Sequence, residues 1–395
     1  MSSQQEKFYD FAIIGAGPAG LLSAYYLKKQ GHKVIIIEAK KEINRKSCGE
    51  YLCPAGVELL KKLELDELLE NFLPLKGMKI VSPDGQILET SFPHSSQGVS
   101  LDRKIFETRL WHKVVASGVD ICWNYPLTKI ERDTRGFCLS SSQALAQEKY
   151  YSRYLIGADG RHSIVARSFN LSKKVKKIKR VALHTLIPME QELERWGEMH
   201  LFEDGSYIGL NPTGSHEMNL TLVLDAVKIK ECRDFPELIK SYLQKSAKLS
   251  FLIPFLTADL SVQIVYPLTH QVKSIAGKDY ALVGDAAGFV DPLTGEGIYN
   301  ALLSASILST SLEKTVEAFA FNKEQSFKNY RKEQNKKLRA KRRLNLFFGW
   351  LLKKPKAMNL IAYFLNKKQS KKDLFVRVIG NIESPVMGLV KLFLI

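Results

Sequence analysis

Residues 11–38 read FAIIGAGPAGLLSAYYLKKQGHKVIIIE, and this stretch decides the fold. The apolar run at 11–14 predicts a buried strand, a glycine-rich turn and a helical run at 21–30 follow it, and residues 34–37 predict a second strand. Strand, GxGxxG turn, helix, strand and a closing acid within about 30 residues form the fingerprint of a dinucleotide-binding βαβ unit. The sequence therefore predicts an α/β domain with a parallel sheet around this unit.

The small residues of the turn each have a physical role in holding a dinucleotide. Gly15 allows the tight turn, Gly17 lets the backbone approach a pyrophosphate, and Gly20 lets the helix pack close to the strand. The N-terminus of the helix offers free N–H groups and the positive end of its dipole to the phosphates. We therefore predict that these three glycines, together with Ala19, contact the cofactor.

Glu38, which closes the second strand, selects the nucleotide. Its carboxylate can accept hydrogen bonds from both ribose hydroxyls of an adenosine, whereas it would repel a 2′-phosphate. The bound nucleotide is therefore predicted to be FAD or NAD(H) rather than NADP(H), and Ala39 is predicted to contact it as well.

Two distant segments favour FAD over NAD. Residues 155–163 (LIGADGRHS) predict a strand that ends in a Gly-Asp-Gly turn. Residues 280–301 (YALVGDAAGFVDPLTGEGIYNA) predict a strand, a Gly-Asp turn, a loop and a helix that begins near Gly295. An NAD-binding domain needs no second Gly-Asp strand end so far downstream, whereas FAD is long enough to extend across the fold to it. We therefore expect FAD.

The same segments resemble the FAD-dependent geranylgeranyl reductase family, which is related to the aromatic-ring hydroxylases with the same glutathione-reductase-type flavin fold. The resemblance covers residues 10–60, 100–168 and 265–310. GDAAGFVDPLTGEGIYNAL at 284–302 is close to the family's signature, and SCGEYLCPAGVELL at 47–60 resembles its cysteine-glycine segment. The resemblance implies an FAD-dependent oxidoreductase.

The resemblance also implies contacts to the flavin. Asp285, with Gly284 before it, would hydrogen-bond the ribityl chain or the neighbouring phosphate region. Gly295, Glu296 and Gly297 would present backbone N–H groups to the N1/C2 oxygen edge of the flavin. Reduced flavin is anionic at that edge, and a helix N-terminus stabilises the charge.

Four more residues are implied at the site. Asp159 resembles the family's aspartate near the pyrophosphate and the nicotinamide approach. Arg103 fits as a counter-charge to the pyrophosphate, with a surface ion pair as the alternative. Cys48 and Glu50 occupy positions that the family places beside the flavin, and they are the candidate catalytic residues. Cys48 would contribute a proton or a soft contact at the ring, or it is a buried packing residue.

The reaction stays open. The family's Tyr-x-Trp-x-Phe-Pro motif is Tyr-Ile-Gly-Leu-Asn-Pro at 207–212, so Gly209 and Asn211 replace two aromatic residues of the prenyl cavity. The Cys-Gly-Glu segment is also similar to flavin monooxygenases that work beside polyketide synthases. Three hypotheses follow: reduction of an alkene in an isoprenoid or other lipid, hydroxylation or epoxidation of an aromatic or polyketide-like compound, and a non-catalytic flavin-containing binding protein.

The electron donor is open as well. A second GxGxxG motif is absent from the sequence, so NADH or NADPH would bind only transiently at the surface, or another reductant is used.

The charge of the chain is concentrated near its C-terminal end. The 395 residues include 58 Lys+Arg and 41 Asp+Glu, a formal charge of +17. Residues 323–377 hold 18 Lys+Arg and 3 Asp+Glu, so 55 residues carry +15 and the other 340 carry +2. The apolar blocks within residues 323–377, which contain Phe347, Trp350 and Tyr363, are too short to span a bilayer. The pattern suits a helix in an anionic membrane interface, or one that packs on the body of the protein.

We expect an FAD-binding domain built from residues 1–170 and 268–320, with a mixed-sheet substrate domain inserted at 171–267. Residues 321–395 are expected to form a helical basic region, and whether 81–97 joins the substrate sheet is open. Five scattered cysteines without a CxxC pair predict neither disulfides nor a metal site, and a secretory signal pattern is absent. These features favour a cytoplasmic protein, peripheral on the inner face of the membrane if the basic region docks there. Nucleic acid is not an expected partner, because the sequence contains no nucleic-acid-binding motif.

Overall fold

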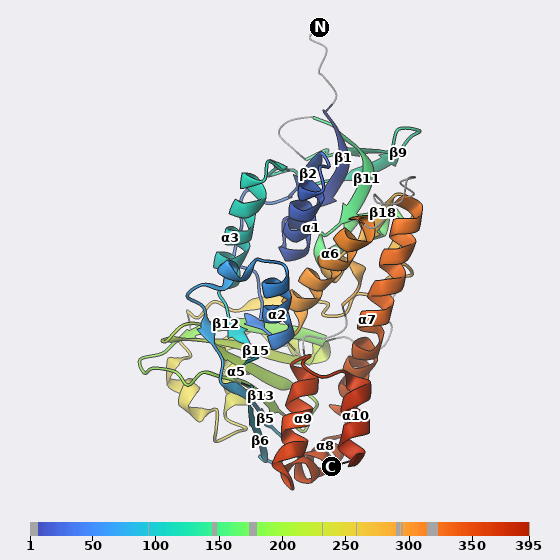
Figure 1. Cartoon of the computed structure of the whole chain (residues 1–395). Helices are drawn as coiled ribbons and strands as arrows, with labels where there is room; N and C mark the ends of the chain where they lie inside the picture. The colour runs from blue at the N-terminus through green and yellow to red at the C-terminus, as the bar shows by residue number, and fades with distance from the viewer. Residues whose placement is uncertain are drawn as a thin grey trace.

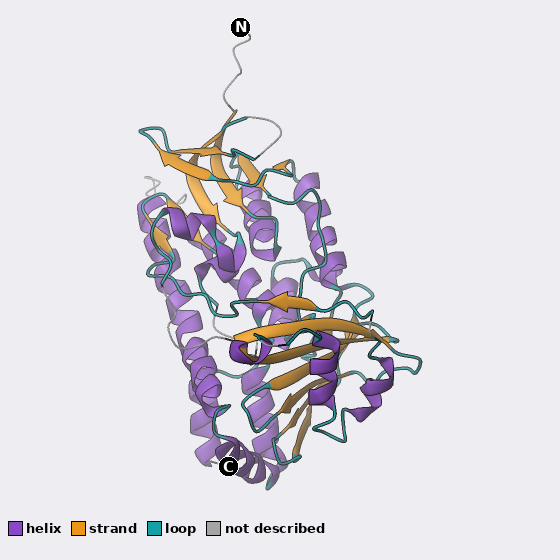
Figure 2. Cartoon of the chain, turned by 180° about the vertical axis from the view of Figure 1, so that it is seen from behind, coloured by secondary structure: helices purple, strands orange, loops and turns teal. Residues whose placement is uncertain are grey.

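The computed structural model describes most of the chain. The described residues are 7–93, 95–143, 148–173, 180–230, 232–257, 259–289, 293, 295–313 and 323–394. Within them the chain forms two large sheets, which Figure 2 shows one above the other, and helices that flank both. The eight-stranded sheet occupies one end of the molecule, and the last three helices, within residues 355–394, occupy the other (Figure 1).

The eight-stranded sheet is built around the predicted βαβ unit. Its strands are β1 (Lys7–Ile14), β2 (Val34–Ile37), β8 (Asp120–Cys122), β9 (Lys129–Arg132), β10 (Phe137–Ser140), β11 (Tyr150–Gly157), β17 (Ala276–Gly277) and β18 (Tyr280–Leu282). Strand β1 pairs in parallel with β2 on one side and β11 on the other, and β8 and β18 extend this parallel core. β2 is buried along its whole length, as its uninterrupted apolar run requires of a strand covered on both faces.

Helices cover this sheet and aim their N-termini at its carboxyl edge. Helix α1 (Pro18–Lys29) begins directly after the glycine turn, three residues before the predicted start, because Pro18 suits the first turn of a helix. It packs against α6 (Gly297–Glu313) and α3 (Arg103–Ala116). Two shorter helices, α2 (Pro54–Lys62) and α4 (Ile164–Ser168), complete this half.

The seven-stranded sheet lies beyond the carboxyl edge of the first. Its strands are β5 (Gly77–Val81), β6 (Ile87–Ser91), β12 (Arg180–Pro188), β13 (Trp196–Leu201), β14 (Tyr207–Pro212), β15 (Glu217–Asp225) and β16 (Gln263–Val265). Their order is β16-β12-β15-β14-β13-β5-β6, so β6 brings part of segment 81–97 into this sheet. Three short strands form a separate small sheet: β3 (Tyr51–Leu52), β4 (Leu73–Pro74) and β7 (Val99–Ser100).

The two faces of the seven-stranded sheet have different partners. One face packs on α5 (Phe235–Leu243) through a core that includes Leu183 and Leu222. The opposite face carries Ala182 and Val223, and it meets the C-terminal helices. The sheet therefore has an apolar cluster on each face: one with α5, and one with the C-terminal helices.

Four helices follow one another from residue 323 onward: α7 (Lys323–Leu351), α8 (Pro355–Asn366), α9 (Gln369–Ile379) and α10 (Pro385–Leu394). α7 runs alongside both sheets, and α8 to α10 cluster at its far end (Figure 1). Leu352, Leu365 and Ile379 are buried in one cluster with Ile80 and Tyr207 of the seven-stranded sheet. One side of the helical region thus packs on the body of the protein. Among the described residues, no helix is both long and apolar enough to cross a bilayer.

Candidate active site

One cavity of about 860 Å³ lies between the two sheets. The carboxyl ends of β1 and β2 reach it through Ile14 and Ile37, and residues 158–162 after β11 reach it too. Ligands of open α/β sheets bind outside the carboxyl ends of the parallel strands, which is the place occupied by this cavity. The opposite wall is the second face of the seven-stranded sheet.

The glycine turn is shaped for close backbone contacts. Gly15 has φ +105°, and a Cβ there would lie 2.6 Å from the carbonyl oxygen of Ala158. A Cβ on Gly20 would lie 2.0 Å from the carbonyl oxygen of Gly15, so only glycine lets helix and turn meet. A Cβ on Gly17 would instead point into the cavity, where Lys46 Nζ is 4.0 Å away. Among the described residues no side chain caps the N-terminus of α1, which leaves its first N–H groups to a ligand.

Glu38 is held in place at the end of β2. Its Oε2 accepts a hydrogen bond from the Ala16 N–H at 2.7 Å, and its Oε1 accepts one from the Lys40 N–H at 3.0 Å. Each carboxylate oxygen keeps a further acceptor site, so this geometry is compatible with the predicted ribose contact. Glu38 and Ala39 both line the cavity.

Asp159 and Asp285 follow neighbouring strands and reach the same cavity. Oδ2 of Asp159 accepts from the Ile164 N–H at 2.6 Å, whereas its Oδ1 is buried and has no partner among the described residues. Burial raises the pKa of both carboxyl groups. The charges of Arg161 and Arg103 oppose the rise at Asp285. Gly284, before Asp285, packs against α1, because a Cβ there would lie 2.9 Å from that of Ala19.

The Gly-Glu-Gly segment lies at the start of α6. Gly297 opens the helix and lines the cavity together with Gly295, which has φ +65°. Glu296 is buried and forms an ion pair with the buried Lys341 of α7 at 2.9 Å, and it also accepts from Asn381. Its carboxylate therefore ties the loop to the C-terminal helices while the helix N-terminus faces the cavity.

Arg103 lines the cavity and is already paired. Its Nε donates to Glu107 Oε1 at 2.6 Å, one helical turn along α3, and Lys46 Nζ lies 3.6 Å from the same buried carboxylate. An ion pair with a buried carboxylate therefore holds the guanidinium at the cavity wall. Whether it contacts a pyrophosphate stays a prediction.

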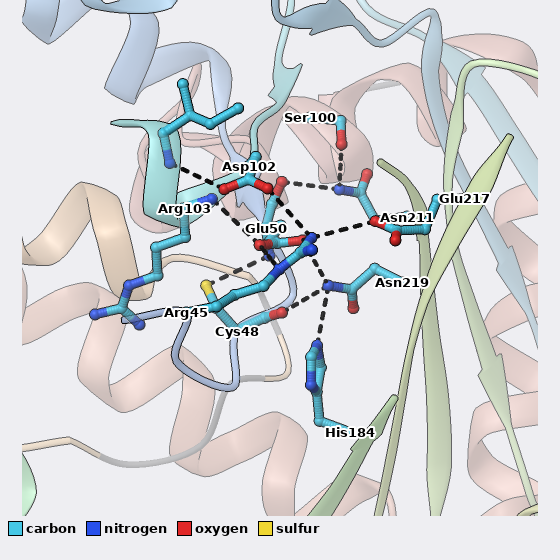
Figure 3. A network of polar contacts seen from close by, with 11 residues as sticks. Arg45, Cys48, Glu50, Ser100, Asp102, Arg103, His184, Asn211, Glu217 and Asn219 are labelled. Carbon is cyan, nitrogen blue, oxygen red and sulfur yellow. Dashed lines mark hydrogen bonds and ion pairs between the residues drawn. The ribbon is translucent and has the colours of Figure 1, made fainter. Parts of the chain in front are cut away.

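A network of polar contacts surrounds Glu50, as Figure 3 shows. Arg45 makes two hydrogen bonds to the Glu50 carboxylate, at 3.0 and 2.7 Å, and lies 3.6 Å from Asp102 and 3.3 Å from Glu217. The carboxylate also accepts from the backbone N–H of Arg103 at 3.2 Å. Glu50 has no exposed surface. It is thus the centre of an ion-paired cluster between the loop at 45–50, which we call the cysteine loop, and the seven-stranded sheet.

Cys48 lies in the cavity wall two residues before Glu50, whose N–H donates to Cys48 Sγ at 3.4 Å. Burial raises the pKa of the Cys48 thiol, so the sulfur keeps its proton near neutral pH. The carbonyl of Cys48 accepts from Asn219 Nδ2 at 2.8 Å. The loop is therefore tied to the seven-stranded sheet at the point where the two halves of the cavity meet.

The two replaced aromatic positions have different environments. A Cβ on Gly209 would meet no described atom within 4 Å, so the position where the resembled family has a tryptophan is open space in the cavity. Asn211 is buried, and its amide donates to Glu50 O and Ser100 Oγ, both at 2.8 Å. One substitution widens the cavity and the other adds a polar tie to the cysteine loop.

These features fit FAD. The N-termini of α1 and α6, at Gly17 and Gly297, line one cavity together with Asp159 and Asp285. The first suits a pyrophosphate, and the second suits an edge that becomes anionic on reduction. The comparison with known families agrees, because residues 9–338 match the family model described as FAD binding domain. The chain belongs to the FAD binding domain family.

Proteins named as reductases, or as similar to a reductase, are similar to this chain in sequence or in structure. The digeranylgeranylglycerophospholipid reductase 1 of Methanosphaera stadtmanae is 25% identical over 331 residues, which are 82% of this chain and 79% of that protein. A geranylgeranyl bacteriochlorophyll reductase-like protein from Thermoplasma acidophilum has a similar structure, with a TM-score of 0.74 and 20% identity over 98% of this chain and 96% of that one. The resemblance found in the sequence is confirmed.

The fold also resembles that of pqsL, a probable FAD-dependent monooxygenase from Pseudomonas aeruginosa. The TM-score is 0.76 at 18% identity, over 89% of this chain and 99% of that one. This chain is an FAD-dependent oxidoreductase, and it shares its fold with proteins of both reaction types.

Several residues of this cavity were not predicted from the sequence. They are Arg45, His184, Asn219 and Thr221, all of which line the cavity. The strand at 217–225 offered a signal, because polar Asn219 and Thr221 alternate with apolar neighbours. That signal shows a polar face without showing whether the face meets solvent or a buried cavity.

Proposed function

We propose that this oxidoreductase reduces an alkene in an isoprenoid or similar lipid. The observation that carries the proposal is the continuity of the cavity. Its cofactor end runs without a break into an apolar wall on the seven-stranded sheet, where Ala182, Val223 and Val265 lie beside Leu268. A long hydrocarbon placed along this wall would be shielded from water with its double bond near the flavin.

FAD bound at this site supplies, in its reduced form, the hydride for such a reaction. The N-termini of α1 and α6 would hold the cofactor, and the apolar wall would exclude water. The protonated Sγ of Cys48, in the wall of the same cavity, is our candidate for the proton that completes the reduction. NADH or NADPH, bound transiently, is the proposed source of electrons.

A monooxygenase acting on an aromatic or polyketide-like compound is the second candidate. The open space at Gly209 favours it, because a cavity without the two family aromatic rings accepts a wider, less linear molecule. The likeness in fold to pqsL is compatible with this reaction and does not by itself support it over reduction.

We also propose a peripheral contact with an anionic membrane. The C-terminal helices expose large apolar side chains at the end of the molecule, which we call the C-terminal apolar face: Leu346, Phe347, Trp350, Leu360, Tyr363, Phe364, Val386, Met387 and Val390. Lys354 lies over the ring of Trp350 at 5.9 Å, and Lys367 lies over that of Tyr363 at 4.8 Å. Apolar groups fringed by lysines complement a negatively charged bilayer surface.

The reaction type is tested without oxygen. The FAD-loaded protein is reduced with dithionite, mixed anaerobically with a digeranylgeranyl lipid, and followed by flavin absorbance and by the mass of the lipid. Reductase activity reoxidises the flavin without oxygen and adds two hydrogens to a double bond. If reoxidation needs oxygen and an oxygen atom enters the added compound, the reductase proposal is wrong and the monooxygenase is favoured.

A further inference from the structure

The seven-stranded sheet presents a cluster of polar side chains to the cavity. In the strand register His184 of β12 is opposite Thr221 of β15, and Asn219 of β15 is opposite Asn211 of β14. Residues two apart on a strand lie on the same face, and all four of these residues line the cavity. We call them the polar row; Figure 3 shows three of its members beside the Glu50 network.

Asn219 joins His184 to the segment that holds Cys48 and Glu50. Its Nδ2 donates to Cys48 O at 2.8 Å and to the Glu50 carboxylate at 3.2 Å, and both of these groups only accept. The same nitrogen lies 3.1 Å from His184 Nε2. Burial lowers the pKa of His184 to about 4, which keeps the ring neutral, with one ring nitrogen a donor and the other an acceptor.

The polar row has hydrogen-bonding capacity that the described residues do not use. His184, Asn211 and Asn219 are 3%, 5% and 1% exposed. Buried atoms without a partner among the described residues are His184 Nδ1, Asn211 Oδ1, Asn219 Oδ1 and Thr221 Oγ1. The two amide oxygens accept, the Thr221 hydroxyl both donates and accepts, and His184 Nδ1 does one or the other according to its tautomer, so the group that complements them donates and accepts at once.

The local charge argues against an anion here. Arg45, whose charge acts on His184, already faces the carboxylates of Glu50, Asp102 and Glu217. Three carboxylates around one guanidinium leave no excess positive charge for a phosphate. A neutral hydroxyl meets the hydrogen-bonding pattern without this electrostatic cost.

The next positions along the same strands are apolar. Two residues beyond His184 and Thr221, Ala182 and Val223 face each other in the register, and Tyr207 is opposite Val223. All three line the cavity. The wall thus changes from polar to apolar within one pair of side chains, as a surface that holds a polar group at the end of a hydrocarbon chain requires.

We propose that the polar row is a subsite for an uncharged hydroxyl of a lipid substrate, whose hydrocarbon lies along Ala182, Val223 and Tyr207. The inference rests on the proposed lipid substrate and adds that the buried polar end is an alcohol rather than a phosphate. Thr221 and His184 would then be specificity-determining residues.

Equilibrium binding to the FAD-loaded protein tests this inference. Geranylgeraniol, the hydrocarbon that lacks its hydroxyl, and geranylgeranyl diphosphate are compared through the change in flavin absorbance. We expect the alcohol to bind roughly tenfold more tightly than the hydrocarbon, as a well-placed neutral hydrogen bond allows, and more tightly than the diphosphate. Thr221→Val should remove most of the preference for the alcohol, and Thr221→Ser should keep it.

A second variant keeps the test valid if Thr221→Val does not fold. His184→Phe keeps a ring and loses the Nδ1 hydrogen-bonding atom, so it should also reduce the preference for the alcohol while leaving the affinity for the hydrocarbon unchanged. Equal binding of alcohol and hydrocarbon to the natural protein, or tighter binding of the diphosphate, overturns the subsite. Failure of all three to bind overturns the lipid substrate and the subsite together, whereas binding of the alcohol without turnover contradicts only the proposed reaction.

Discussion

At the scale of single residues, Glu50 has the clearest structural role. It has no exposed surface, and its carboxylate is held by Arg45, the Arg103 N–H and Asn219. A buried charge with this many partners stabilises the fold only while each partner remains. Glu50 was predicted as catalytic, and that role stays a prediction beside the structural one.

Glu50→Gln should therefore destabilise the FAD-loaded protein by roughly 2 to 3 kcal/mol, because Arg45 loses its best-buried counter-charge. Urea unfolding at neutral pH measures the effect. Glu217→Gln is the matched control, since Glu217 also faces Arg45 at 3.3 Å but its side chain is 37% exposed. Its loss should be below about 1 kcal/mol. Equal losses in the two variants would contradict the central role of Glu50.

His184 should make stability depend on pH. Its pKa is lowered by burial to about 4 in the fold, against 6.5 when unfolded. Between these values the unfolded chain binds the extra proton, so the contribution of the neutral ring is complete above pH 6.5 and is lost as the pH falls toward 4. The loss should reach about 2 kcal/mol near pH 4.5.

Comparing the natural protein with His184→Gln isolates the contribution of His184 to the pH dependence of stability. Urea midpoints are measured from pH 7.5 down to about 4.5. The natural protein should lose stability more steeply than the variant, because the variant has no group to titrate at this position. Parallel slopes would show that His184 is not buried in neutral form.

At the scale of elements, the turn between β1 and α1 contains one glycine that the fold requires and one that cofactor binding is predicted to require. A Cβ on Gly20 would meet the Gly15 carbonyl oxygen at 2.0 Å, whereas a Cβ on Gly17 would enter the cavity. Gly17 has φ −83°, which alanine adopts without strain. Two neighbouring glycines thus serve different purposes.

Gly17→Ala should weaken FAD binding at least roughly tenfold, because the methyl group occupies the approach of the pyrophosphate. The unfolding free energy of the FAD-free protein should change by less than about 0.5 kcal/mol. Gly20→Ala should instead cost the FAD-free protein about 1 to 3 kcal/mol through overpacking. Flavin release on dilution and urea unfolding distinguish the two, and a loss of stability in Gly17→Ala as large as that in Gly20→Ala would contradict this division.

Local signals explain which elements the sequence could predict. The unit around residues 11–38 was predictable because the turn, the caps and the apolar runs all act within about 30 residues. β12 carries a weaker signal, because His184 interrupts its apolar run VALHTLI and a highly charged segment precedes it. The polar row depends on which strands become neighbours and on which face meets the cavity, so its role could not be read from any single strand.

At the scale of the whole molecule, the C-terminal helices belong to the site as well as to the surface. Lys341 of α7 pairs with Glu296 at the start of α6 and donates to the carbonyls of Val378 and Ile379 at the end of α9. Ile379 also lines the cavity. The apolar blocks of this region were compatible with packing or with membrane contact, and the structure shows packing on one side with a C-terminal apolar face left exposed.

This exposed face leads to a prediction about membranes. The triple variant Phe347→Ser, Trp350→Ser and Leu360→Ser should reduce binding to mixed phosphatidylcholine and phosphatidylglycerol vesicles at least tenfold. The three side chains are 49%, 57% and 67% exposed, and each would lose apolar contact worth on the order of 25 cal/mol per Å². Binding of the natural protein should also weaken from about 0.1 M to 1 M salt, as the attraction of the lysines is screened. Cosedimentation measures both effects.

Val227→Ser is the control, since Val227 is 63% exposed in the short 3-10 helix after β15, outside the C-terminal helices. It should leave vesicle binding unchanged. A further interpretation is that the C-terminal apolar face binds a second copy of the chain. Sedimentation velocity distinguishes this self-association from membrane binding. If the natural protein does not bind the vesicles but sediments as a dimer, and the triple variant sediments as a monomer, the face mediates self-association and the membrane proposal is wrong. Vesicle binding by a monomer, lost in the triple variant and kept in Val227→Ser, supports an enzyme that takes its substrate at the bilayer surface.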